Sequence, residues 1–102
     1  MVSVEPTEEQ FLQSVLELAR WCGWQAYHAR DSRRSPAGFL DLVLAKPDEP
    51  VIFAELKVGR RRLTAAQRAW AAVLQAARGT EVYLWYPRDF PVIAARLQRG
   101  RG

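Results

Sequence analysis

A strand–helix–strand pattern in the second half of the chain constrains the fold most. The segment VIFAELKV, residues 51–58, is apolar on both alternating faces over most of its length, which is typical of a strand at the centre of a sheet. The segment LTAAQRAWAAVLQAARG, residues 63–79, follows as a helix, and TEVYLWY, residues 80–86, as a second strand. Two strands joined by a helix pair in parallel through a right-handed crossover. The pattern therefore predicts an α/β sheet with helices packed on it.

The first half of the chain predicts one helix and two more strands. A helix is expected over 7–23, since Thr7 is a natural N-cap and Gln10 stands three residues later as its capping partner. WQAYHA, residues 24–29, and FLDLVLA, residues 39–45, are strand candidates. With a short helix after residue 86, the expected order is α-β-β-β-α-β-α. Residues 1–6 are expected to form an N-terminal arm and residues 98–102 a basic tail.

Composition favours one globular domain spanning residues 1–102. Hydrophobic residues make up 49% of the chain and charged residues 25%, which is ordinary for a globular protein and excludes general disorder. No apolar run is long enough to span a bilayer, and the N-terminus lacks the pattern of a signal peptide. A lone Cys22 cannot form an internal disulfide and is expected to be a buried thiol in a reducing compartment. We therefore expect a cytoplasmic protein with no membrane association and no organic cofactor.

Three charged residues interrupt segments that should be apolar strands. Glu55 and Lys57 lie two apart in VIFAELKV and so point to the same face, while Asp41 interrupts FLDLVLA. An ion pair between Glu55 and Lys57 at the end of the sheet is one explanation. However, the turn KPDEP, residues 46–50, would make the two strands a hairpin and bring Asp41 beside Glu55. Two adjacent carboxylates repel each other unless a cation lies between them.

Magnesium fits this pair of carboxylates. It prefers hard oxygen ligands and is commonly held by one or two carboxylates, with waters and phosphate completing its shell. The backbone carbonyl of Leu56 could add one ligand. Such a metal would lower the pKa of a bound water and polarise a phosphate, and Lys57 could orient or help deprotonate that water. Asp41, Glu55 and Lys57 thus predict phosphodiester hydrolysis, with Mg²⁺ as cofactor and Mn²⁺ as a substitute.

These residues and their spacing resemble the PD-(D/E)XK nuclease superfamily. The pattern is Gly38-x-x-Asp41, then thirteen residues, then Glu55-Leu-Lys57, then Gln67 on the next helix. The flanking segments are closest to the VRR-NUC family: a TE start to the first helix, a following GW, YHARDSRRS, ELK and L-T-x-x-Q-R-x-W. The resemblance covers about residues 7–97. One departure is Leu40, where the superfamily has proline, a residue that shapes the backbone rather than the chemistry.

The resemblance implies a restriction-endonuclease-like core with a central mixed β-sheet. It implies metal ligation by Asp41 and Glu55, and a catalytic role for Lys57. It also implies roles for Gln67 and for an acid on the first helix, for which Glu8 is the best match. Its substrate would be branched DNA resembling a Holliday junction, cut by a homodimer.

Simpler explanations exist for the last two residues. Glu8 and its neighbour Glu9 both lie in the first helical turn, where the helix dipole favours acids, and Glu9 is the fallback for the metal-binding acid. Gln67 stands three residues after Thr64 and so suits a capping box. Both roles of Gln67 could hold in part.

Basic residues gather around the predicted site. The net charge is +4, and nine of the fifteen basic residues form three sets: Arg30, Arg33 and Arg34; Arg60, Arg61 and Arg62; and, grouped with the tail, Arg96, Arg99 and Arg101. The first two sets flank Asp41 and Lys57 in the chain, as expected of a track for the phosphate backbone. His28, the only histidine, is either structural or a contact to phosphate or substrate.

Nothing in the sequence resembles a base-reading motif, so selectivity for DNA structure rather than for sequence is expected. The four tryptophans are expected in the core or at an interface rather than as platforms for bases. The leading hypothesis is a metal-dependent endonuclease acting on DNA. The alternative is a catalytically inactive module that binds nucleic acid with a nuclease fold, and a third hypothesis is a structural subunit of a larger assembly.

Overall fold

The computed structural model describes residues 5–29 and 38–99 and has the mixed α/β fold that the sequence predicts. The observed order of elements is the predicted one, with an added 3₁₀ turn. The elements are α1 (Glu8–Trp21), β1 (Gln25–His28), β2 (Leu42–Ala45), β3 (Val51–Leu56), α2 (Ala65–Ala76), β4 (Thr80–Trp85), the 3₁₀ turn (Pro87–Asp89) and α3 (Phe90–Gln98).

The four strands form one mixed sheet in the order β1-β2-β3-β4. The first three strands are antiparallel to one another, and β2 and β3 form the predicted hairpin. β3 and β4 are parallel and are connected by α2, so the predicted parallel pairing through a helix is confirmed. The strand with the continuous apolar pattern, β3, occupies an interior position, as expected.

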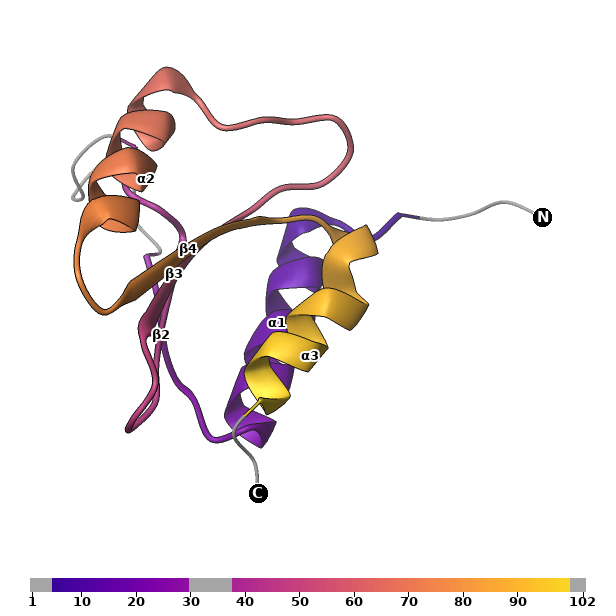
Figure 1. Cartoon of the computed structure of the whole chain (residues 1–102). Coiled ribbons are helices and arrows are strands. Elements are labelled where there is room, and N and C mark those ends of the chain that lie inside the picture. Colours follow the sequence, from indigo (N-terminus) through magenta and orange to yellow (C-terminus); the bar gives the residue numbers. More distant parts are fainter. Residues whose placement is uncertain (1–4, 30–37, 100–102) are drawn as a thin grey trace.

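Helices cover both faces of the sheet, but unequally. α1 and α3 lie together on one face and α2 lies on the other (Figure 1). The face under α1 and α3 carries the core, where Leu42, Leu44, Ile52, Ala54 and Leu56 pack against residues such as Val15, Ala19, Ile93 and Leu97. In contrast, α2 has no fully buried residue. It is attached through the ring of Trp70, whose centroid lies 5.0 Å from that of Phe39, which in turn lies 6.1 Å from the ring of Phe53.

All four strands are shorter than predicted, and in β2 and β3 the difference concerns the charged residues. β2 begins at Leu42, so Asp41 lies in a bend just before the strand rather than inside it. β3 ends at Leu56, so Lys57 follows the strand, although its amide still donates to the carbonyl of Trp85 at 3.0 Å. Both changes reduce the cost of burying charge, because side chains at the end of a strand reach polar partners more easily than those in its middle.

The helix ends also differ from expectation. Gly79 was expected to end the second helix, but α2 ends at Ala76, and Gly79, with a φ of 74°, forms the turn into β4. α3 continues to Gln98, so the predicted basic tail begins later than residue 98. The structure does not describe residues 1–4 of the arm or Arg101 of the tail.

Arg96 was grouped with the basic tail, and this prediction is wrong. Its side chain is buried and pairs with Glu49 at 3.0 Å and with Glu81 at 2.7 Å. The tail arginine therefore attaches α3 to the sheet. Cys22 is a buried free thiol, as predicted.

Among the tryptophans, Trp24 and Trp85 are in the core, whereas Trp21 is 75% exposed and lies outside it. None of the helices within 5–29 and 38–99 combines the length and apolar content needed to cross a membrane.

Candidate functional site

The charged residues singled out from the sequence meet at one end of β3. The β2–β3 register pairs Leu42 with Ala54, so the next pair along the hairpin is Asp41 with Glu55. Glu55 is 3% exposed and Lys57 is 4% exposed, while Asp41 is partly exposed. The hairpin thus brings together the two carboxylates, as predicted from the turn.

Glu55 is held by donors from three segments of the chain. Its Oε1 accepts from the Asp41 amide at 3.1 Å. Its Oε2 lies 3.1 Å from Nζ of Lys57 and accepts from Nε2 of Gln67, also at 3.1 Å. The expected ion pair between Glu55 and Lys57 therefore exists, and it forms one part of a larger cluster. We call Asp41, Glu55, Lys57 and Gln67 the acidic-end cluster.

The surroundings of Glu55 favour its protonated form. Burial, followed by the nearby charge of Asp41, raises the pKa of Glu55 from 4.5 to about 7, even though Lys57 acts in the opposite direction. One ammonium group does not compensate two carboxylates that lie side by side. The cluster therefore has the electrostatic character of a site that would gain from an additional cation.

Gln67 has both of the roles considered from the sequence. The backbone amide of Gln67 donates to Oγ1 of Thr64 at 3.1 Å, and the side-chain Oε1 of Gln67 accepts from the backbone amide of Thr64 at 2.9 Å. These two bonds complete the capping box of α2. Its remaining Nε2 group donates to Glu55. The helix start thus aims an amide at the acidic-end cluster without losing its cap.

A cavity of about 100 Å³ adjoins this cluster. Besides Asp41, it is lined by three predicted site residues, Glu8, His28 and Leu56, and by Glu9, the fallback for Glu8. Its lining residues are Glu8, Glu9, Leu12, His28, Asp41 and Leu56. Glu8 and Glu9 come from the first turn of α1, and His28 from the end of β1. The structure therefore brings the first-helix acids, the histidine and Asp41 to one place, although they are up to 33 positions apart in the sequence.

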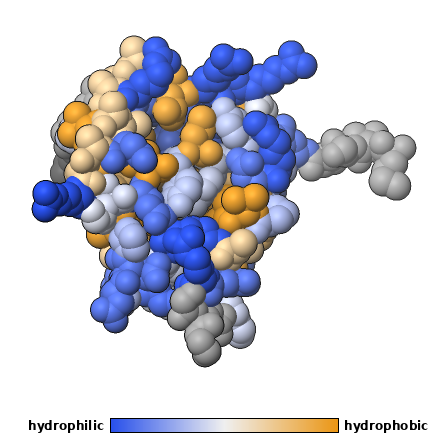
Figure 2. All heavy atoms as spheres, viewed as in Figure 1, coloured by the Kyte–Doolittle hydropathy of each residue, from blue (hydrophilic) through white to orange (hydrophobic). Residues whose placement is uncertain are grey.

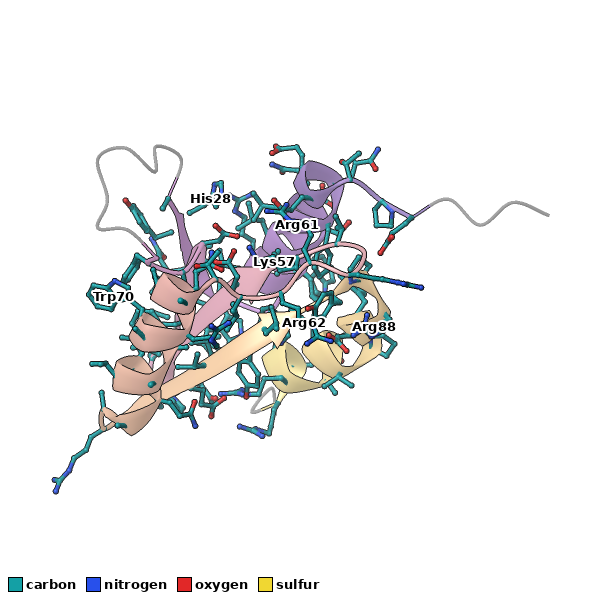
Figure 3. The ribbon with its side chains drawn as sticks, turned by 90° about the horizontal axis from the view of Figure 1, so that it is seen from above. His28, Lys57, Arg61, Arg62, Trp70 and Arg88 are labelled. Carbon is teal, nitrogen blue, oxygen red and sulfur yellow. The ribbon has the colours of Figure 1, made fainter. Side chains whose placement is uncertain are left out.

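The loop after β3 carries Gly59, Arg60, Arg61 and Arg62, and we call it the arginine loop. It contacts the start of α1 beside the cavity. Nη1 of Arg61 lies 3.1 Å from Oε1 of Glu8, and both side chains are substantially exposed. The loop is also attached to the N-terminal arm, since Glu5 accepts from the Gly59 amide at 3.0 Å. Figure 3 shows Arg61 on the same side as His28 and Lys57. Figure 2 shows hydrophilic side chains over the part of the molecule where this loop runs.

The other predicted DNA-binding arginines have different outcomes. Arg60 and Arg62 are exposed on the same loop as Arg61, as a phosphate-contacting role requires. Arg30, Arg33 and Arg34 lie outside the described residues.

Sequence reasoning missed Arg88, which lies near the arginine loop. Its guanidinium stacks over the ring of Tyr86 at 4.3 Å, and the Tyr86 hydroxyl donates to the carbonyl of Arg61. The sequence could have placed Arg88 beside the arginine loop. β3 and β4 were predicted to be parallel, and the segments that follow parallel strands leave the sheet at the same edge.

Two carboxylates, those of Asp41 and Glu55, are the side chains at this site that suit a hard divalent cation. Within the described residues, no three Asp, Glu, His or Cys side chains form a group that could hold a metal ion. Asp41 and Glu55 provide a facing pair, and Mg²⁺ commonly needs no more than two carboxylates when water and phosphate supply the other ligands. Glu8 shares the cavity with Asp41 but is engaged by Arg61.

Comparison with known proteins identifies no similar family: no family model matches the chain, and neither a curated protein nor a solved structure matches it. The function is therefore inferred from the site itself.

Proposed function

We propose that this protein is a divalent-metal-dependent endonuclease that hydrolyses phosphodiester bonds in DNA. The observation that carries the proposal is the acidic-end cluster: a facing pair of carboxylates, with a buried lysine and an amide on the same carboxylate. A structural ion pair needs only one acid and one base. The second carboxylate at the same point, whose charge adds to burial in raising the pKa of Glu55, is the feature that a structural explanation leaves without a purpose.

The roles of the residues follow from their positions. Asp41 and Glu55 would hold Mg²⁺ or Mn²⁺, with the Leu56 carbonyl as a further ligand and Glu8 at the edge of the site. The metal would supply an activated water and neutralise charge on the phosphate. Lys57, fixed by Glu55, would position that water, and Gln67 would hold Glu55 in place.

The exposed arginines would bind the DNA backbone beside this site. Arg60, Arg61 and Arg62 lie on one loop, and Arg88 lies next to it. Within residues 5–29 and 38–99 this basic border includes no helix or strand shaped for a groove, so we propose selectivity for DNA structure rather than for sequence. The resemblance of the motif favours branched DNA. The similarity of motif to the PD-(D/E)XK superfamily supports the same proposal, including action as a homodimer.

A cleavage assay tests the proposal directly. Purified protein is incubated with a four-way junction, a flap and plain duplex, with Mg²⁺, with Mn²⁺ and with chelator. Asp41→Asn and Lys57→Ala should abolish cleavage, whereas Asp48→Asn should cleave like the wild type, because Asp48 is exposed at the far end of the β2–β3 hairpin. Asparagine is chosen at 48 because it tolerates the positive φ of 67° found there.

The alternative is an inactive nucleic-acid-binding module. One observation favours it, namely that the acidic-end cluster is internally satisfied by Lys57, Gln67 and the Asp41 amide. If the wild-type protein binds DNA but cuts none of the three substrates with either metal, the module explanation replaces the enzyme. If the variants cut as well as the wild type, the acidic-end cluster is not the active site.

A further inference from the structure

The described sheet ends in an edge strand, β1, whose own sequence lacks the residues that usually prevent edge pairing. β1 has the sequence QAYH, without proline and without a carboxylate, lysine or arginine. Natural edge strands are commonly protected by such charges, by proline or by a bulge. The opposite edge strand, β4, carries Glu81 in an ion pair with Arg96. β1 is therefore the edge better suited to pairing with another strand.

The register of β1 shows which backbone groups point outward. The Ala29 amide donates to the carbonyl of Asp41, the residue that faces it when the β1–β2 register is continued. In an antiparallel ladder, directly facing residues exchange hydrogen bonds only at every second pair. The next such pair is Tyr27 with Val43, so the N–H and C=O groups of Ala26 and His28 point away from β2, toward the outer edge of the described sheet.

A groove of about 480 Å³ runs between this edge and α1. Its lining residues are Glu9, Leu12, Gln13, Leu16, Arg20, Ala26, Tyr27 and His28. The apolar residues Leu12, Leu16 and Ala26 are flanked by polar ones, and Tyr27 is 64% exposed. Both residues with outward backbone groups, Ala26 and His28, line the groove.

We propose that the groove is the interface of a homodimer, in which β1 pairs antiparallel with β1 of a second copy across a two-fold axis at Tyr27. Ala26 then faces the partner's His28, and both have outward-pointing backbone groups that can exchange hydrogen bonds. Tyr27 faces the partner's Tyr27 in a pair without hydrogen bonds, where side chains approach most closely. The two sheets join into one continuous sheet, and the exposed tyrosine becomes covered.

The charges on α1 favour a second copy of this chain, rather than an unrelated strand, as the partner of β1. Glu9 and Leu12 share the small cavity with His28, so Glu9 lies at the His28 end of the groove and Arg20 lies toward the other end. A two-fold axis at Tyr27 reverses the direction of the second copy. It therefore places Glu9 toward the partner's Arg20, and Arg20 toward the partner's Glu9. The same attraction occurs twice, as an isologous interface requires.

This dimer would also place two candidate sites around one axis. His28 belongs both to the groove and to the cavity beside Asp41, so each site adjoins the interface. A paired arrangement suits a substrate with two strands to cut. That use of the dimer rests on the proposed nuclease function, whereas the pairing of β1 does not.

Sedimentation velocity over a range of protein concentrations tests the interface without any DNA. The wild type should show a concentration-dependent dimer. Ala26→Pro should be monomeric, since it removes an N–H that points away from β2 and takes no part in the β1–β2 ladder, and proline is tolerated in edge strands at such positions. Circular dichroism and thermal unfolding establish that this variant is folded.

Charge exchange provides the sharper experiment. Glu9→Arg and Arg20→Glu should each weaken the dimer about tenfold, because each replaces two attractions with two repulsions. The double variant should recover most of the affinity. Glu17→Arg is the matched control, as Glu17 is exposed on the same helix but does not line the groove.

A wild type that stays monomeric up to millimolar concentration overturns the proposal. So does a dimer that Ala26→Pro and the two single charge reversals leave unchanged. A monomeric wild type would also contradict cleavage as a homodimer, but neither result bears on metal-dependent hydrolysis at the acidic-end cluster, so the failure of this interface and the failure of the nuclease proposal remain distinguishable.

Discussion

Two buried charge clusters among the described residues look alike in composition and differ in electrostatic balance. At one end of β3, two carboxylates and one ammonium form the acidic-end cluster, with the pKa of Glu55 raised to about 7. At the other, Arg96 pairs with Glu49 and Glu81, and its guanidinium also lies 5.4 Å from the ring of Trp24. Here hydrogen bonding to Arg96 lowers the pKa of Glu81.

The difference lies in how the carboxylates are paired. Arg96 spreads its positive charge over a planar fork, and it can hold two carboxylates at separate nitrogens. Lys57 is a point charge that contacts Glu55, while the adjacent Asp41 keeps Glu55 under repulsion. A compensated cluster attaches one element to another, whereas an under-compensated cluster is one that a cation would stabilise. Four experiments test this comparison, in order of decreasing expected effect.

Removing Arg96 should cause the largest loss of stability. Arg96→Met leaves two partly buried carboxylates without their partner and detaches α3 from the sheet, so we expect about 3 kcal/mol of destabilisation in urea unfolding. Arg99→Met is the matched control. Arg99 also approaches Glu81, at 3.6 Å, but its side chain is 63% exposed, so its removal should cost about 0.5 kcal/mol or less. Similar costs for both variants would contradict a structural role specific to Arg96.

The two clusters should respond to pH in opposite directions. Because the pKa of Glu55 is raised on folding, its contribution to stability is fully present below pH 4.5 and is lost as the pH rises to about 7. The pKa of Glu81 is lowered, so its contribution is present at neutral pH and is lost as the pH falls.

Chemical unfolding at several pH values measures this difference. Between pH 5 and pH 7, the wild type should lose about 2 kcal/mol relative to Glu55→Gln, a part of the roughly 3 kcal/mol that the full pKa change represents. Relative to Glu81→Gln, the wild type should gain stability over the same range or remain level. A carboxyl NMR titration of Glu55 should show a midpoint near 7 that falls in Asp41→Asn and on addition of Mg²⁺. A midpoint near 4.5 would show that neither burial nor the charge of Asp41 raises the pKa of Glu55.

Gln67 should contribute more to the free energy of unfolding than its capping box alone provides. Gln67→Ala removes the cap of α2 and a hydrogen bond to a buried carboxylate, so a loss of about 1.5 kcal/mol is expected. Gln10→Ala removes the equivalent cap of α1, where the Gln10 side chain accepts from the Thr7 amide at 2.9 Å. That variant should lose about 0.5 kcal/mol. Equal losses would mean that the bond from Gln67 to Glu55 contributes nothing.

Arg61 should matter little for stability and more for binding. Its pair with Glu8 is exposed, so Arg61→Ala should change the free energy of unfolding by about 0.5 kcal/mol or less. If Arg61 contacts one phosphate, the slope of log K against log salt should become shallower by about 0.9 in fluorescence anisotropy. Arg78→Ala, in the exposed turn before β4, should leave that slope unaltered. An unchanged slope for Arg61→Ala would remove it from the phosphate track.

Local spacing was enough to predict the elements and the hairpin that joins Asp41 to Glu55. The two capping boxes, the apolar pattern of β3 and the crossover to β4 all act within a few residues or one supersecondary unit, and each is confirmed. Strand ends were predicted less well. Asp41 and Lys57 were placed inside strands, but burial of charge favours their positions just beyond the strand ends.

The sequence by itself determined the order of helices and strands, the hairpin and the identity of the charged residues at its open end, because these depend on short-range periodicity and capping. Only the tertiary structure decided the role of each charge. Arg96 appeared to belong to a basic tail and is a buried structural residue, while Arg88 went unnoticed and lies beside the arginine loop. The physical reason is that burial and long-range pairing set the energy of a charge, and both depend on segments far apart in the chain.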